Sequence, residues 1–253
     1  MTIRPIAFLA SCVFFLAACG TATSTADTAD TADATPADVL SGTDATTSTD
    51  ATADSTSADA YAPPKYVCNQ VMGVSVTGEW FAGGFESFVD DGHWQGMTLS
   101  HAYVDLWADS TNTVWGTPLV SPCTKNSSDP DRILFTGCNW DYKTAAEWTQ
   151  ALTAVVGNLK GKYPSVKRID LLTMIRAPGN KLCEGALNNE AIVAPYIDEA
   201  MANVAAAFPD LVVVAPKFEA PNCDVFVLGG PHFTPDGAAV LGQIFGAYYN
   251  HNQ

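Results

Sequence analysis

The sequence has few basic residues and no closely spaced set of metal-ligating side chains. Its 253 residues include 12 Lys and Arg against 27 Asp and Glu, a formal net charge of −15. A chain this acidic lacks the basic surface that binds nucleic acids or anionic lipids, so we expect neither partner. The seven cysteines form no Cys-x-x-Cys pair and no His/Cys cluster with zinc-ligand spacing. A structural metal is therefore not expected.

The first apolar run of the chain is too short to cross a bilayer. It extends over residues 6–18 and follows a single positive charge at Arg4, whereas a membrane-spanning helix needs about 20 apolar residues. A short apolar segment behind a positive charge is typical of an export signal. We therefore interpret residues 1–19 as a signal peptide.

The end of this segment resembles the bacterial lipobox. Residues 16–19 read Leu-Ala-Ala-Cys, and the resemblance implies that cleavage leaves Cys19 as a lipidated N-terminus. Membrane attachment would then occur only through this lipid anchor, and Gly20 after it resembles the outer-membrane sorting pattern. The alternative is an ordinary secretory signal that is cleaved near Ala18. Both interpretations place the protein outside the cytoplasm, in the cell envelope or secreted.

Residues 20–62 lack Lys and Arg altogether and have few large apolar side chains. They are nearly all Thr, Ala, Asp and Ser, with eight aspartates and a Thr-Ala-Asp repeat at 25–33. Such a composition cannot bury a core, so the segment is expected to be a disordered tether. Its root-mean-square reach would be about 35 to 40 Å, enough to hold a domain clear of a membrane surface.

The remaining residues, 63–253, are expected to form one domain. Without Arg4 and the eight tether aspartates, 11 basic and 19 acidic residues remain, a net charge of −8. This balance is acidic but ordinary, so it says little about the substrate. About 190 residues suffice for one domain with a sizeable core.

This domain contains five cysteines, an odd number. In an exported protein they predict one or two disulfides and one unpaired thiol. The pair we favour is Cys183 with Cys223, because each follows an expected strand at the same edge of the sheet. The five are Cys68, Cys123, Cys138, Cys183 and Cys223.

Apolar runs alternate with amphipathic stretches along the domain. Strands are expected at 67–76, 101–107, 132–136, 168–175 and 211–215, and helices at 144–159, 189–208 and 235–249. This alternation predicts an α/β fold, a three-layer sandwich with a mainly parallel five-stranded sheet covered on both faces. Ligands bind at the carboxyl ends of such strands. Four polar residues are expected there: Ser75, Asn139, Arg176 and His232.

Three of these residues supply the groups that ester hydrolysis needs. Ser75 is the candidate nucleophile and His232 the candidate general base. The side-chain amide of Asn139 can donate to the oxyanion of a tetrahedral intermediate. His232 stands directly before the last expected helix, whose start is marked by Thr234 as N-cap and Pro235 as the first helical residue. Arg176 would either hold a substrate carboxylate or form a structural ion pair.

The same residues lie in motifs that resemble those of the SGNH (GDSL-type) hydrolases, a family named for a Ser, a Gly, an Asn and a His in separate blocks. Gly-Val-Ser at 73–75 is similar to the first block and Gly-Cys-Asn at 137–139 to the third. Pro-His-Phe-Thr-Pro-Asp-Gly-Ala-Ala at 231–239 is similar to the last block and its following helix. The order and spacing of the blocks cover nearly the whole domain.

The resemblance implies a flavodoxin-like SGNH hydrolase fold and a serine esterase that needs no cofactor. Ser75 would attack an ester carbonyl, and His232 would act as general base and then as general acid. Asn139 and the Ser75 backbone N–H would bind the oxyanion. Gly96 and Gly116 are both candidates for the second-block glycine, which would share the oxyanion.

The chain departs from the family pattern at three positions where an Asp is usual. These are Val74, Trp140 and Gly229. The last departure matters most, because the Asp three residues before the histidine normally orients the imidazole. Asp224 is the nearest acid upstream but is poorly placed for that role. A Ser-His pair with another acceptor is therefore expected.

Three hypotheses of function remain open. The first is an esterase acting on a small-molecule or polysaccharide ester, such as an acylated or acetylated carbohydrate. The second is a catalytically degenerate surface-binding lipoprotein, which the three replaced Asp positions would favour. A structural envelope lipoprotein is a third hypothesis.

Overall fold

The computed structural model describes residues 66–89, 93–123, 129–180, 183, 194–228 and 230–251. The expected signal peptide, the lipobox cysteine Cys19 and the expected tether lie outside these residues, as does Gly229. No helix in the described part of the chain is long and apolar enough to cross a membrane.

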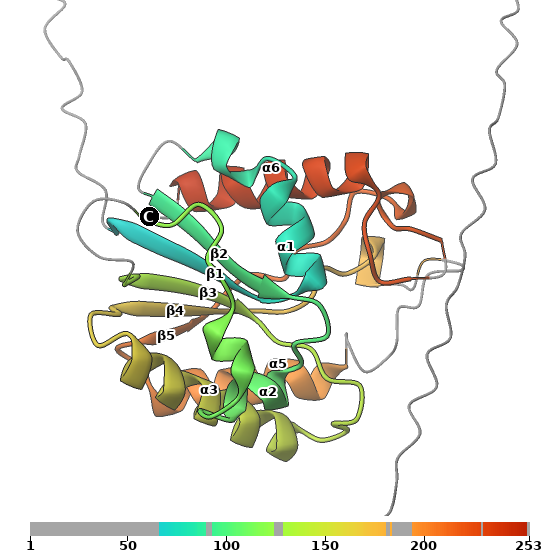
Figure 1. Ribbon diagram of the computed structural model, residues 1–253. Coiled ribbons are helices and arrows are strands. Elements are labelled where there is room, and N and C mark those ends of the chain that lie inside the picture. Colours follow the sequence, from blue (N-terminus) through green and yellow to red (C-terminus); the bar gives the residue numbers. More distant parts are fainter. Residues whose placement is uncertain are drawn as a thin grey trace, which may run out of the picture. The chain divides into compact units, whose positions relative to one another are not determined.

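The core of the domain is a five-stranded sheet in which every pair of neighbouring strands is parallel. The strands follow the spatial order β2-β1-β3-β4-β5 (Figure 1). This order is the flavodoxin-like one, so the expected fold class is confirmed. The strands are β1 (Cys68–Val74), β2 (His93–Leu99), β3 (Arg132–Thr136), β4 (Arg168–Leu172) and β5 (Val212–Val214).

Helices cover both faces of the sheet and complete the three layers (Figure 1). One face carries α1 (Ser75–Ala82) and α6 (Pro235–His251). The other carries α2 (Val104–Ala108), α3 (Ala145–Lys162) and α5 (Pro195–Ala207). Within the described residues, four short 3₁₀ turns lie between these elements: η1 (Phe85–Phe88), η2 (Thr113–Gly116), η3 (Pro178–Asn180) and η4 (Cys223–Val225).

The prediction of a strand at 101–107 is wrong. The second strand is β2, and residues 104–108 form the helix α2 instead. Val104 and Trp107, both fully buried, are three residues apart, which is a helical spacing. β2 shows no long apolar run because it contains Gln95, whose buried amide donates to the Gln70 side chain on β1 at 2.7 Å.

The other expected elements are present with shifted ends. The strand at 132–136 and the start of α6 agree with the sequence reading, and the Thr144 side chain caps α3 in a capping box with Glu147. The fourth strand ends at Leu172 and the fifth covers only 212–214. The first strand ends at Val74, where α1 begins directly. Residues 189–193 of the second expected helix lie outside the described residues.

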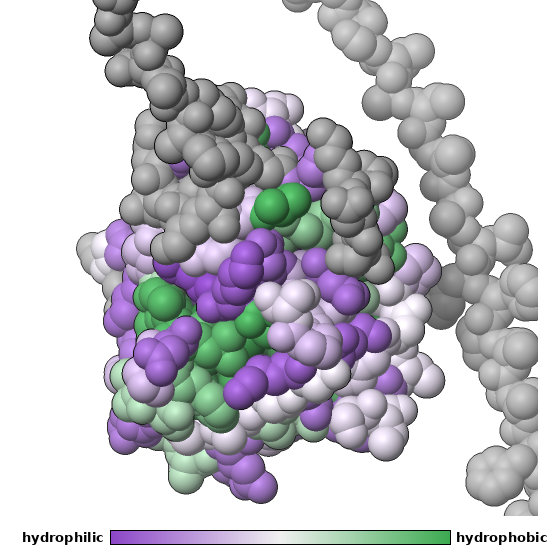
Figure 2. Space-filling model, turned by 90° about the vertical axis from the view of Figure 1, so that its left-hand side faces the viewer, coloured by the Kyte–Doolittle hydropathy of each residue, from purple (hydrophilic) through white to green (hydrophobic). Residues whose placement is uncertain are grey.

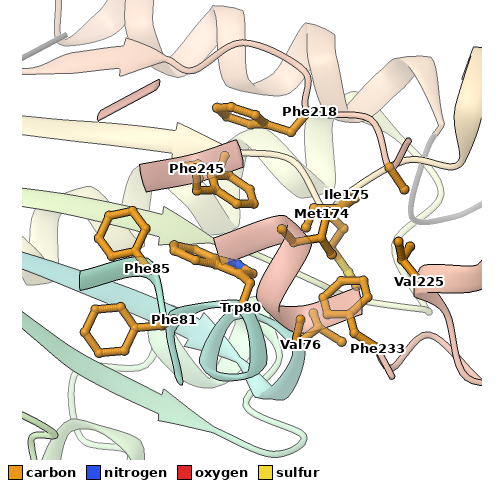
Figure 3. Packing of buried hydrophobic residues seen from close by; sticks show 14 of the residues in the cluster. Val76, Trp80, Phe81, Phe85, Met174, Ile175, Phe218, Val225, Phe233 and Phe245 are labelled. Atoms are coloured by element: carbon orange, nitrogen blue, oxygen red, sulfur yellow. The ribbon is translucent and has the colours of Figure 1, made fainter. Parts of the chain in front are cut away.

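Aromatic side chains fill the space between the sheet and the α1/α6 layer (Figure 3). Trp80 of α1 stacks on Phe245 of α6, with ring centroids 4.2 Å apart, and meets Phe85 edge-on at 5.2 Å. Only 2% of Trp80 is exposed. This packing fixes α1 against α6, the two helices that flank the candidate site.

Two disulfides cross-link the domain. The expected pair Cys183–Cys223 is present, and Cys68–Cys123 is the second. Cys138 is the unpaired cysteine among the described residues, and burial raises the pKa of its thiol to about 12. Disulfides are compatible with an exported protein.

The end of the domain at which the strands begin carries both polar and apolar residues on its surface. Figure 2 shows this side, on which polar residues surround an apolar area. The candidate site residues belong to the other end, because Ser75 and the segment before α6 lie where the strands end (Figure 1).

Candidate active site

Ser75 is the first residue of α1, placed there by an abrupt change from strand to helix. Gly73, at the end of β1, has φ of 146°, a region that favours glycine. A Cβ at this position would lie 2.4 Å from the Thr136 carbonyl oxygen of β3, so no side chain fits. Val74 is extended, and the helix then begins with Ser75. The backbone N–H groups of this first turn point away from the helix without intrahelical partners.

His232 lies on a short hairpin between η4 and α6. Phe226 and Phe233 form an antiparallel bridge, and the Val227 N–H donates to the His232 carbonyl oxygen at 2.8 Å. Phe233 is buried in the same cluster as Val76 of α1 (Figure 3). The expected helix start is confirmed, because α6 begins at Pro235 and the Thr234 hydroxyl accepts from the Gly237 N–H at 3.0 Å.

Ser75 and His232 line the same cavity, of about 180 Å³. Its other walls come from the loops after β2 and β3 and include Tyr103 and Trp140. No hydrogen bond joins Ser75 to His232 among the described residues, an arrangement common in unliganded enzymes. A larger cavity, of about 390 Å³, lies at α2 and α3 and contains neither residue.

The acid that meets His232 is Glu79, which the sequence analysis missed. Glu79 Oε1 lies 2.5 Å from His232 Nδ1, and Oε2 accepts from the Phe233 N–H at 2.9 Å. Glu79 is four residues after Ser75 on α1, so both lie on one side of the helix. The spacing was visible in the sequence, but it carries meaning only once a helix is known to begin at Ser75.

Asn139 is buried just after β3, with both ends of its amide engaged. Its Oδ1 accepts from the backbone N–H groups of Asp141 at 2.8 Å and Tyr142 at 3.3 Å. Its Nδ2 donates to Asp105 Oδ1 at 2.9 Å. Asn139 itself is not among the residues that line the cavity of Ser75 and His232, although its two neighbours, Cys138 and Trp140, are.

The two glycine candidates lie away from the cavity. Gly96 is inside β2, where an added Cβ would lie 3.0 Å from the Phe81 ring, and Gly116 is exposed in η2. The loop after β2 instead brings Ser100 and His101 to the cavity. His101 adopts φ of 59°, a left-handed conformation uncommon outside glycine.

The remaining charged candidates have structural partners. Arg176, only 4% exposed, pairs with Asp198 of α5 at 3.0 Å, so the ion-pair interpretation is confirmed. The Asp224 backbone N–H donates to the Asn222 side chain, and its carbonyl oxygen accepts from the Thr234 hydroxyl. The described residues contain no group of three or more His, Cys, Asp or Glu side chains that could hold a metal ion.

Comparison with known proteins gave structural similarities only. No protein-family model and no curated protein sequence matches the chain. A carbohydrate esterase family 3 structure from Talaromyces cellulolyticus is 14% identical, with a TM-score of 0.46, covering 73% of this chain and 97% of that one. A lipolytic protein of the G-D-S-L family from Desulfitobacterium hafniense DCB-2 is 14% identical, with a TM-score of 0.43, covering 71% and 98%. A family two carbohydrate esterase from Clostridium thermocellum is 11% identical, with a TM-score of 0.44, covering 76% and 66%.

Proposed function

We propose that the protein is a serine esterase that hydrolyses carboxylic esters, with Ser75 as nucleophile and His232 as general base. The observation that carries this proposal is the shared cavity at the carboxyl edge of the sheet, which a serine and a histidine line together. A nucleophile beside a base whose second ring nitrogen meets an acceptor is the arrangement that acyl transfer requires.

The reaction would proceed through an acyl-enzyme. As Ser75 Oγ attacks the ester carbonyl carbon, His232 Nε2 takes the hydroxyl proton and a tetrahedral intermediate forms. The intermediate collapses when the C–O bond to the alcohol breaks, and the Nε2 proton passes to the leaving oxygen. Water then attacks the acyl-Ser75 ester while Nε2 takes one of its protons. The bond between the acyl carbon and Ser75 Oγ breaks, Nε2 returns the proton to Oγ, and the carboxylic acid leaves.

The negative oxygen of the intermediate needs donors, and the start of α1 supplies the first. The Ser75 backbone N–H belongs to the first turn, where the helix dipole favours negative charge. Asn139 is proposed as the second donor. The backbone N–H groups on its Oδ1 orient the amide, and of the two Nδ2 hydrogens one is used by Asp105.

The dimensions and walls of the cavity support a short acyl group. A volume of about 180 Å³ is small, and the aromatic residues Tyr103 and Trp140 line it together with Ser75 and His232. Aromatic faces pack well against the apolar face of a sugar ring. We therefore propose short acyl esters of carbohydrates, such as acetyl esters, as the first substrates to test. The proposed setting is the cell envelope, through Cys19 or after secretion.

The test is ester turnover by the purified chain and its Ser75→Ala variant. Removal of the nucleophile should lower kcat by about 10⁴-fold or more on p-nitrophenyl acetate and on an acetylated oligosaccharide. Ser165→Ala, at an exposed serine outside the cavity, is the matched control and should retain full activity. Equal rates for wild type and Ser75→Ala would remove Ser75 from the mechanism.

A fluorophosphonate probe separates the esterase from a binding protein. Stoichiometric modification that is lost in Ser75→Ala is expected of the esterase. Well-folded protein that takes up no probe would favour the degenerate surface-binding lipoprotein instead.

A further inference from the structure

Glu79 binds the segment that carries His232 through both of its carboxylate oxygens. Oε1 meets His232 Nδ1 at 2.5 Å, and Oε2 accepts from the next backbone N–H, that of Phe233, at 2.9 Å. The contact with the Phe233 N–H holds the Glu79 carboxylate against the backbone of this segment, and the other oxygen of the same carboxylate meets the imidazole.

This contact decides which ring nitrogen carries the proton. An ionised carboxylate only accepts hydrogen bonds, so the Nδ1 facing Glu79 must donate. In neutral His232 the proton therefore lies on Nδ1, and Nε2 keeps the lone pair that can take the Ser75 proton. Among the described residues no other side chain hydrogen-bonds His232.

We propose that Glu79 is the positioning residue of the catalytic pair, an acid supplied from the helix that begins with the nucleophile. This inference rests on the proposed esterase function and deepens it. α1 presents Ser75 at its first residue and Glu79 one turn later, and the imidazole would bridge the two. The chain thereby compensates for Gly229, which stands where the related motif has its acid.

The nearby acids do not offer the same contact. Asp224 precedes the hairpin, but no hydrogen bond among the described residues joins its carboxylate to His232. Asp236 lies in the first turn of α6, beyond the histidine. Glu79 is the acid that the structure places on the imidazole.

The partial exposure of the His232 and Glu79 side chains determines how much kcat should fall when Glu79 is replaced. The side chains of His232 and Glu79 are 47% and 29% exposed, so solvent weakens the attraction between their charges. The contribution of Glu79 then comes mainly from orientation and choice of tautomer. Loss of a buried triad acid costs about 10⁴-fold in kcat, and for this more exposed contact we expect roughly 10²-fold to 10³-fold.

The Glu79→Gln variant isolates this role. A glutamine keeps one carbonyl oxygen for the Phe233 N–H, so the hairpin remains attached, while its NH₂ group faces Nδ1 and forces the proton onto Nε2. We expect kcat to fall by roughly 10²-fold to 10³-fold, with KM nearly unchanged. Glu199→Gln, at an exposed glutamate of α5 on the other face of the sheet, is the control and should behave as wild type.

Nitrogen-15 NMR of labelled histidine gives a readout that does not depend on turnover. The His232 signals, assigned by their loss in His232→Gln, should show protonated Nδ1 in the wild type and protonated Nε2 in Glu79→Gln. A wild type protonated on Nε2, or a tautomer unchanged in Glu79→Gln, would overturn the inference, and the wild-type measurement stands even if the variant does not fold.

The two measurements together separate this inference from the proposed function. A switched tautomer with wild-type kcat would show that the tautomer set by Glu79 does not affect turnover, and would overturn the positioning role. A wild type without any ester turnover would overturn the esterase, while the NMR result would still decide whether Glu79 sets the tautomer.

Discussion

At the scale of single residues, the proposed site depends on side chains whose partners fix one orientation. The Asn139 amide is oriented by two backbone N–H groups on its oxygen, and the His232 ring by the Glu79 carboxylate. Ser75 has no such restraint, since its hydroxyl has no hydrogen bond among the described residues that line the cavity. In the proposed mechanism, the Ser75 hydroxyl is therefore free to turn toward an arriving ester.

Asn139→Asp tests the proposed second oxyanion donor. An aspartate keeps oxygen acceptors for the Asp141 and Tyr142 N–H groups but has no N–H to offer. Loss of one oxyanion donor typically costs 10²-fold to 10³-fold in kcat, or about 2.7 to 4 kcal/mol, and we expect a fall of that order with little change in KM. Stability should also decrease, because two carboxylates would then face each other at Asp105.

Asn158→Asp is the matched control for that loss of stability. The Asn158 amide donates to the carbonyl oxygens of Trp107 and Ala108, away from the cavity. Urea unfolding should show a decrease for this variant too, whereas its kcat should stay near wild type. If both variants lost activity to the same degree, the effect at 139 would be structural and the donor role would be rejected.

At the scale of elements, the sequence was informative where local signals agree with the tertiary structure. The third strand is a short apolar run bounded by turns, and α3 and α6 begin at recognisable caps, so these elements were predicted closely. β2 was missed because buried Gln95 and Gly96 interrupt its apolar pattern. Its burial depends on Gln70 of the neighbouring strand, which no local pattern encodes.

The candidate site, too, could be predicted only in part from the sequence. Ser75 and His232 lie in recognisable motifs, and the structure brings both to one cavity. Glu79 was missed because residues 75–76 were read as the end of the strand, and its proximity to His232 arises only when α1 packs beside α6. Long-range contacts of this kind follow from packing, not from spacing along the chain.

Gly73→Ala tests the sharp transition from β1 to α1. The variant requires an alanine at φ of 146° and a Cβ 2.4 Å from the Thr136 carbonyl, so β1 and β3 would have to separate. We expect a loss of at least about 2 kcal/mol in the free energy of unfolding, measured in urea. Ser75, the proposed nucleophile, would shift with the strand end, so kcat should fall as well.

Gly157→Ala provides the opposite control. Gly157 is exposed within α3, and an added Cβ there meets nothing within 4 Å. Alanine in a helix interior is favoured over glycine by about 0.5 to 1 kcal/mol, so this variant should be more stable than wild type. A Gly73→Ala variant as stable as Gly157→Ala would refute the close-approach argument.

At the scale of the whole molecule, two disulfides restrain different regions of one domain. Cys68–Cys123 ties the start of β1 to the segment beyond η2, and Cys183–Cys223 holds η4, directly ahead of the His232 hairpin. They close loops of 55 and 40 residues in sequence separation. A chain-entropy account gives each about 4 kcal/mol, so the two should contribute similarly to stability.

Removal of one disulfide should affect activity differently from removal of the other. In the double variant Cys183→Ser/Cys223→Ser, η4 loses its cross-link, and the imidazole is held by Glu79 and the hairpin alone. We therefore expect a lower kcat even at temperatures well below the unfolding temperature of the variant. In Cys68→Ser/Cys123→Ser, the link removed lies at the opposite end of β1 from Ser75. This variant should lose a similar free energy of unfolding but keep its kcat wherever the protein remains folded. Thermal unfolding and ester turnover measured on the same samples compare the two, and equal losses of kcat at equal folded fraction would show that Cys183–Cys223 has no special relation to the site.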